Sequence, residues 1–188
     1  MKKTIILSWI FTLGLMSSAF SQAFDIDTKV VALGLGFGSS IGPSFNTTQL
    51  PGISLQYEQG MWDVGGPGVV SLGGYVGYKG YSYKYSSMGI DTKSTWNYTI
   101  IGARSAYHFT GIDNNRLDLY GGLMLGYYFV NYKLDTNQGY SSSGSAYGNS
   151  FSLDLYVGAR YYLNEKIGLF GELGYGVSYL NLGAVLKL

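Results

Sequence analysis

Apolar and polar residues alternate along most of the chain after residue 23, with a period of two residues. This period is that of a β-strand whose two faces meet different surroundings. No stretch after residue 23 has a convincing helical period. The alternation covers eight segments: 29–38, 53–59, 69–85, 94–109, 117–132, 151–163, 167–175 and 179–188. Eight such segments, separated by turns rich in glycine and polar residues, predict an all-β fold, an eight-stranded antiparallel up-and-down barrel. Within 94–109, residues 96–99 do not keep a clear phase, so we expect a bulge there.

The first 23 residues have the layout of a secretory signal peptide. Lys2 and Lys3 precede an apolar run over residues 4–16, and Ser21-Gln22-Ala23 fits a cleavage site with small residues. The apolar run is shorter than the roughly 20 residues that cross a bilayer as a helix. We therefore expect cleavage after Ala23 and one barrel domain over residues 24–188.

The face opposite the large aliphatic residues carries nearly all of the charges within the predicted strands. The same face is rich in Gly, Ala and Ser, which the surface of a soluble barrel does not need. The crowded lumen of a narrow eight-stranded barrel does need small residues. We therefore place the aliphatic face against lipid and predict an interior charge network. Its members are Glu58, Lys79, Arg104, Asp118, Asp154, Arg160 and Glu172, with Lys187 on the same face.

Aromatic residues lie near the ends of the predicted aliphatic face. Amphipathic aromatic rings are stable at the two lipid–water interfaces, so we expect two girdles. One contains Phe37, Tyr78, Tyr127, Phe129 and Tyr175, and the other contains Tyr57, Tyr107, Phe109 and Tyr161. Connections at one end, such as 164–166, are shorter than those at the other, such as 86–93 and 133–149. This asymmetry is typical of membrane barrels with short periplasmic turns.

The amino-acid composition excludes several classes of function. The formal net charge is +1 and charged residues make up 12% of the chain, so a nucleic-acid-binding protein is not expected. The chain has no Cys, which excludes disulfides and cysteine metal sites, and it has one His. We expect no metal and no cofactor. A signal peptide and an outward apolar face together indicate the bacterial outer membrane.

Residues 157–183 (VGARYYLNEKIGLFGELGYGVSYLNLG) resemble the C-terminal hairpins of small bacterial outer-membrane β-barrel proteins, the OmpX/OmpA-like, porin-family group. The resemblance implies a compact barrel with a lumen filled by side chains. It also implies contact with outer-membrane lipid and lipopolysaccharide, and handling by periplasmic chaperones and the barrel-assembly machinery. The family usually ends in Phe, whereas this chain ends in Leu188. Members of the family are described as structural, adhesive or weakly pore-forming.

The predicted lumen admits two interpretations. A short turn at 164–166 places Gly158 opposite Glu172 and makes Arg160 a diagonal neighbour of Glu172. Asp118 is expected to pair with Arg104. These charges form either an ion-selective path or a salt-bridge network that plugs the barrel.

An enzyme of the outer leaflet would need a nucleophile with a base. The single candidate base, His108, is expected near the periplasmic rim, so we predict no enzyme.

Three functions remain open at this stage. The first is a non-enzymatic outer-membrane barrel with a structural or surface-interaction role, whose loops meet a surface ligand. Residues 139–150, GYSSSGSAYGNS, suit either adaptable contacts or plain flexibility. The second is a small pore for solutes. The third is a secreted, soluble, lipocalin-like binder, which would bury Leu119, Leu123 and Leu125.

Overall fold

The computed structural model describes residues 22–38, 48–144, 149–175 and 178–188. They form strands only, and among them no helix is long and apolar enough to cross a bilayer. The strands are β1 (Lys29–Phe37), β2 (Thr48–Gln49), β3 (Gly52–Asp63), β4 (Gly68–Ser87), β5 (Ile90–Phe109), β6 (Leu117–Thr136), β7 (Ser141–Gly144), β8 (Ser150–Tyr162), β9 (Ile167–Gly174) and β10 (Leu180–Lys187). The expected signal peptide lies outside the described residues, apart from Gln22 and Ala23, and its cleavage stays a prediction.

Eight of these strands close into a barrel. The order around the ring is β4-β3-β1-β10-β9-β8-β6-β5, and β5 pairs with β4 to complete it. The seam between the first and last strands runs from Val30↔Lys187 to Phe37↔Leu180. All neighbours are antiparallel, so the predicted eight-stranded fold is confirmed. The short strands β2 and β7 were not predicted; they pair with β4 and β6 outside the ring.

The aliphatic face points outward. On β6, Leu119, Leu123 and Leu125 are 38%, 50% and 56% exposed, whereas Asp118 and Met124 on the other face of the strand are buried. A soluble lipocalin-like barrel would have the reverse arrangement, so that interpretation is wrong. Polar side chains fill the lumen instead, and the exterior matches hydrocarbon.

The expected bulge at residues 96–99 is absent. Strand β5 keeps an unbroken register with β4 and β6 through this stretch, and the register shift lies in β3 between Gly60 and Trp62. The alternation weakens at residues 96–99 because most of their side chains are only partly buried on both faces. The expected connection 86–93 is also mostly strand, with its turn at Met88 and Gly89.

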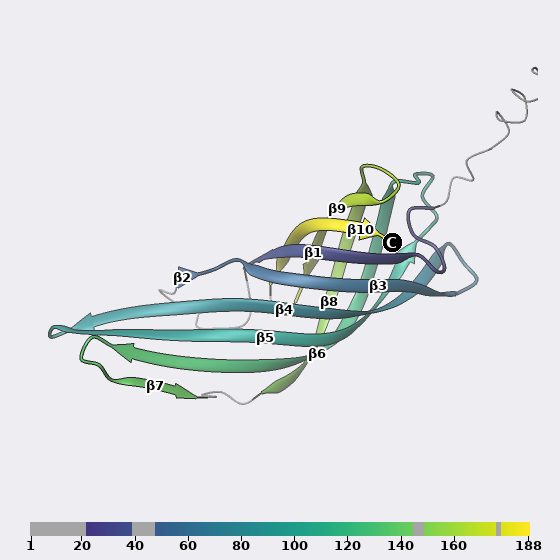
Figure 1. Ribbon diagram of the computed structural model, residues 1–188. Coiled ribbons are helices and arrows are strands. Elements are labelled where there is room, and N and C mark those ends of the chain that lie inside the picture. Colours follow the sequence, from purple (N-terminus) through teal and green to yellow (C-terminus); the bar gives the residue numbers. More distant parts are fainter. Residues whose placement is uncertain (1–21, 39–47, 145–148, 176–177) are drawn as a thin grey trace, which may run out of the picture.

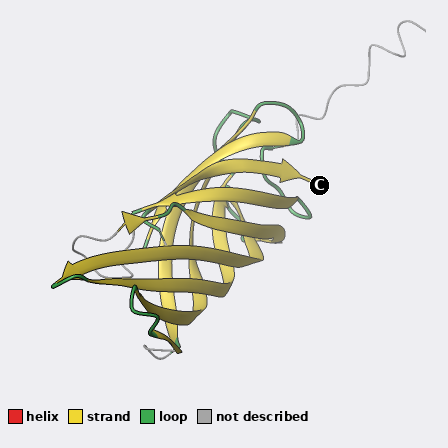
Figure 2. Ribbon diagram, turned by 60° about the vertical axis from the view of Figure 1, so that its left-hand side comes forward, coloured by secondary structure: helices red, strands yellow, loops and turns green. Residues whose placement is uncertain are grey.

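Three neighbouring strands continue past the barrel. β4, β5 and β6 have 20 residues each, whereas β1, β9 and β10 have nine, eight and eight. About 9 to 11 residues of a tilted strand cross a bilayer, so roughly half of each long strand lies beyond it. Figures 1 and 2 show these ends of β4–β6, joined by β7, as a protruding sheet. We call residues 79–87, 90–98 and 130–136, with β7, the outer sheet.

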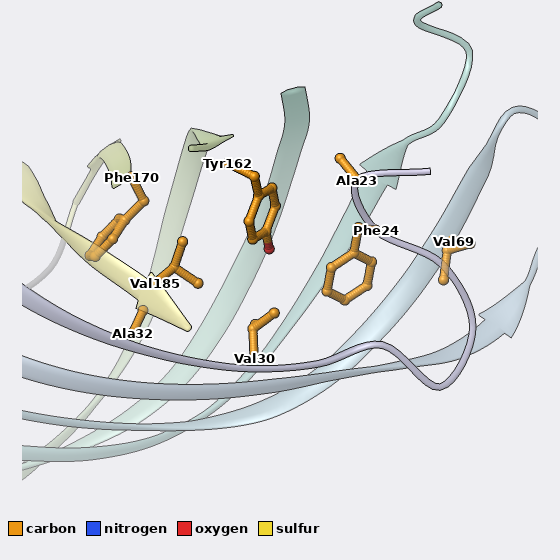
Figure 3. Close-up of a cluster of buried hydrophobic side chains, with 8 residues drawn as sticks. All are labelled: Ala23, Phe24, Val30, Ala32, Val69, Tyr162, Phe170 and Val185. Atoms are coloured by element: carbon orange, nitrogen blue, oxygen red, sulfur yellow. The ribbon is translucent and has the colours of Figure 1, made fainter. Parts of the chain in front are cut away.

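At the opposite end, the segment before β1 folds back into the barrel mouth. Phe24 is buried in a cluster with its neighbour Ala23 and with side chains from the surrounding strands: Val30, Ala32, Val69, Tyr162, Phe170 and Val185 (Figure 3). The chain then turns through Asp27, whose φ is 62°, and Asp27 N–H donates to the Gly60 carbonyl at 3.0 Å. A side chain at Gly60 would collide with the Asp25 carbonyl. The segment therefore closes this end of the lumen.

Candidate functional site: the lumen and the outer sheet

A buried ion network crosses the lumen, centred on Glu58 of β3. The Glu58 carboxylate pairs with Arg104 Nε of β5 at 2.6 Å and with the Arg160 guanidinium of β8. All three side chains are 1% exposed. One carboxylate thus joins two arginines that come from different sides of the ring.

Two further carboxylates accept hydrogen bonds from the arginines. Arg104 Nη2 donates to Glu172 Oε2 at 2.7 Å, and Arg160 Nη1 donates to Asp118 Oδ2 at 3.2 Å. Aromatic rings cover both guanidinium groups: Tyr156 lies 4.1 Å from Arg104 and Tyr120 lies 4.4 Å from Arg160, each measured from Cζ to the ring centroid. Pairing and stacking of this kind offset the cost of burying charge.

The predicted partners within this network were wrong, although the register behind them was right. Gly158 lies opposite Glu172 and Arg160 opposite Phe170, as expected. Arg160, however, pairs with Glu58 and Asp118, and Arg104 pairs with Glu58 and Glu172. The physical reason is the width of the barrel, because a long arginine side chain reaches across the lumen as readily as to the next strand.

The other predicted members lie outside these ion pairs; Lys79 and Asp154 are buried, and Lys187 is half-buried. Lys79 Nζ donates to the Gly38 carbonyl at 2.6 Å, and Asp154 accepts from Tyr128 and Ser152 at 3.4 Å each. Lys187 Nζ lies 4.6 Å from the Tyr162 ring centroid. The predicted set therefore divides into five network residues and separate lumen charges.

The network also holds a Ser–His–Asp arrangement that the sequence did not reveal. His108 Nδ1 lies 2.8 Å from Asp118 Oδ1, and His108 Nε2 lies 3.0 Å from Ser71 Oγ. These are the distances of a catalytic triad. Ser71 was missed because it is one of many small lumen-facing residues, and only the register of β4 against β5 brings it to His108.

Little free space remains between these side chains. Above the Arg104–Glu172 pair lies a cavity of about 30 Å³, lined also by Tyr75, Asp154 and Asn181. That volume holds about one water molecule. Among the described residues, no three His, Asp or Glu side chains are placed to hold a metal ion.

The predicted girdle residues lie on the outer surface at two levels. Near the outer sheet, Tyr78 pairs with Thr99, and Thr99 with Phe129. At the other end, Tyr107 lies opposite Val70 and Tyr161 opposite Leu117. Exposed aromatic side chains on these levels are Phe37, Tyr57, Tyr78, Tyr107, Phe109, Phe129, Tyr161 and Tyr175, and Tyr127 is half-buried.

The outer sheet presents charged side chains on one face. Lys84 and Lys93 lie directly opposite each other on β4 and β5. On β6, Lys133 Nζ lies 3.0 Å from Asp135 Oδ2, and the hydrogen bond from Lys133 lowers the pKa of Asp135. Of the predicted loop 139–150, residues 141–144 form β7 and residues 145–148 lie outside the described residues.

The closed ring, its outward apolar band and its polar lumen define an eight-stranded β-barrel of the outer-membrane type. No protein-family model and no curated protein sequence matches the chain. Solved structures that are similar in fold are small bacterial outer-membrane proteins.

Two of these structures illustrate the likeness. Ail, the attachment invasion locus protein of Yersinia pestis, in complex with the heparin analogue sucrose octasulfate, is 15% identical, with a TM-score of 0.49 over 86% of this chain and 94% of that chain. Neisserial surface protein A is 19% identical, with a TM-score of 0.42 over 86% of this chain and 96% of that chain.

Proposed function

We propose that this chain is a non-enzymatic integral outer-membrane barrel with a structural or surface-interaction role and a closed lumen. The observation that carries the proposal is the network of Glu58 with Arg104 and Arg160, which spans the lumen between β3, β5 and β8. Carboxylates and guanidinium groups alternate through this network, and aromatic rings lie against both arginines. Outer-membrane lipid, lipopolysaccharide, periplasmic chaperones and the barrel-assembly machinery are the partners that we expect for such a barrel.

The Ser–His–Asp arrangement supports this interpretation rather than a hydrolase. A nucleophile must meet its substrate, and both Ser71 and His108 are 0% exposed. Phe24 covers the imidazole, and the Ser71 hydroxyl lies within hydrogen-bonding distance of the Ala106 carbonyl. The three groups satisfy one another, as buried polar side chains in a packed interior must.

Conductance in planar bilayers tests the closed lumen. We expect trace currents or none from the wild-type protein, because the ion network blocks the path. The double variant Arg104→Ala/Glu172→Ala removes one guanidinium with its carboxylate, and any residual current should rise. Stable wild-type channels that change ion selectivity when Arg104 or Arg160 is neutralised would establish the small-pore function instead.

The state of the protein in these recordings is checked by electrophoresis with and without boiling. A closed membrane barrel that resists SDS until heated changes its mobility on boiling. The wild type and the double variant should both show this change when isolated from the outer-membrane fraction. A wild-type protein recovered as a soluble periplasmic species without the change would contradict the proposal.

A further inference from the structure

We infer that the free end of the outer sheet docks on a second lipid surface, one that carries anionic headgroups. This inference rests on the proposed surface-interaction role and names its partner. The docking tip consists of the apolar side chains of Tyr85, Met88 and Ile90, with Lys84 and Lys93 behind them. These apolar residues are 55%, 100% and 39% exposed, at the end of the hairpin that lies farthest from the barrel (Figure 1).

Met88 occupies a position that its side chain does not favour. The turn between β4 and β5 has φ values of 50° at Met88 and 80° at Gly89, and Ser87 pairs with Ile90 across it. Two-residue turns with positive φ at both positions favour Asn or Gly at the first, because a larger side chain is strained there. The Met88 side chain is fully exposed, so it gains no free energy from burial at this site. Such a residue points to a function.

The connection between β6 and β7 holds the docking tip in place. Asn137, in the connection between β6 and β7, donates from its side chain to the Gly89 carbonyl and from its backbone to the Asp91 carbonyl, both at 3.0 Å. Tyr140 in the same connection is 62% exposed and adds apolar surface. The two hydrogen bonds of Asn137 hold the two hairpin ends together, which limits the conformational entropy that the tip loses on binding.

The lysines indicate the charge of the partner. Like charges directly opposite each other in a sheet are destabilising, and Lys84 and Lys93 form such a pair. Asp135 lies opposite Lys93 and is also paired with Lys133, and Asp91 is the other acid of this face. Three lysines against two acids leave this face with a charge of +1, which favours an anionic partner. A hollow of about 510 Å³ lies between Lys84, Lys93, Asp91 and Asp135. A phosphate headgroup seated there would relieve the repulsion between the two lysines.

The position of the tip sets it apart from the protein's own bilayer. Nine residues of β4 separate Tyr78, at the level of one aromatic rim, from Ser87 at the turn. At roughly 3.3 Å per residue and a strand tilt of about 45°, the tip lies about 20 Å beyond the rim. Apolar residues on a projecting end, with cationic residues behind them, have the chemistry that inserts into a membrane interface. We therefore assign the partner as the lipid of an opposing membrane.

Co-flotation tests the inference with the protein held in nanodiscs, so that its own barrel is already lipid-embedded. The probes are vesicles of phosphatidylcholine, alone or mixed with phosphatidylserine, and empty nanodiscs give the background. We expect the wild type to bind the mixed vesicles more tightly, and binding to weaken with salt. Met88→Asn should weaken binding about tenfold through loss of apolar contact, while its turn becomes less strained. Met88→Leu should retain binding.

Two further variants separate the contributions. Lys84→Gln/Lys93→Gln should lose the preference for phosphatidylserine. Val64→Asn removes a 54% exposed apolar residue at the opposite end of the barrel and should bind like the wild type. All variants should keep the heat-dependent change in mobility. Absence of wild-type binding, or equal binding by Met88→Asn, would overturn the inference, whereas the proposed barrel is tested separately by conductance and mobility.

Discussion

The ring of Phe24 lies flat against the imidazole of His108, with the centroids 3.6 Å apart and the planes 8° apart. Phe24 belongs to the segment that precedes β1, and His108 lies near the end of β5. The contact therefore joins the start of the folded chain to the ion network. It also separates the network from the periplasmic mouth, since Phe24 itself is 2% exposed.

Phe24→Ala should destabilise the barrel by about 3 kcal/mol, because it leaves a cavity among Val30, Val69 and Tyr162. Urea unfolding in lipid, followed by tryptophan fluorescence, measures the loss. Phe109→Ala is the matched control, since Phe109 lies at the same end of the barrel but is 42% exposed on its outside. The control should lose much less stability. Equal losses would mean that Phe24 does not pack in the mouth.

Glu58→Gln should be more damaging than an ordinary loss of one charge. It leaves Arg104 and Arg160 each short of one carboxylate in a buried site. Breaking a buried ion pair from one side costs about 3–5 kcal/mol. The temperature at which half of the SDS-resistant barrel converts to the unfolded form, read by electrophoresis after heating, should fall markedly. Glu165→Gln, in the exposed turn between β8 and β9, should leave that temperature unchanged.

Double-mutant cycles can test which charges interact. We expect a coupling energy above about 1 kcal/mol between Arg104 and Glu172, which pair at 2.7 Å. Arg104 and Asp118 should be coupled much more weakly, since Asp118 bonds to Arg160 and His108. Unfolding free energies of the wild type, the three single variants and the two double variants supply both values. The reverse order would restore the pairing expected from the sequence.

The sequence predicted the barrel well because side-chain alternation is a local property. Each strand such as β6 shows in its own residues which face is apolar, and the number of strands follows by counting. The register across a short turn was also predictable, because Gly158 lies opposite Glu172 as expected. The pairing of Arg104 with Glu58 could not be predicted from local register, because β4 separates β5 from β3 in the ring. Contacts across the lumen depend on strand tilt and barrel width, which alternation does not encode.

The length of the strands in the outer sheet was underestimated for a related reason. Residues 86–93 are mostly polar and lack alternation, which is typical of a loop. They form strand nevertheless, because both faces of the outer sheet meet water or partly covered side chains and need no apolar stripe. The contact between Ser71 and His108 could not be predicted for another reason. Ser71 is one of several small residues on its face of β4, and only the pairing of β4 with β5 brings it close to His108.

Ser71 should not react with fluorophosphonate probes, because its hydroxyl is fully buried beside His108 and Phe24. Ser71→Ala should cost about 1 kcal/mol of stability through lost hydrogen bonds. Labelling of the folded protein, read by gel fluorescence or mass spectrometry, measures reactivity. Labelling that disappears in both Ser71→Ala and His108→Gln would reveal a working nucleophile and contradict the structural role.

Gly183→Ala should hinder closure of the barrel at the seam between β1 and β10. A Cβ at Gly183 would collide with the Leu33 carbonyl, which belongs to the backbone of β1 and cannot rotate away. Gly171, on the adjacent strand β9, offers a matched control, since a Cβ there would meet only Leu182 Cδ2 at 3.4 Å. We expect Gly171→Ala to fold like the wild type and Gly183→Ala to give a smaller fraction of the compact, SDS-resistant form. The fraction of compact species after refolding into lipid vesicles measures the effect. If both variants fold equally well, β1 and β10 can move apart enough to admit a Cβ at Gly183. Closure of the seam, which pairs Val30↔Lys187 through Phe37↔Leu180, would then not require glycine at this position.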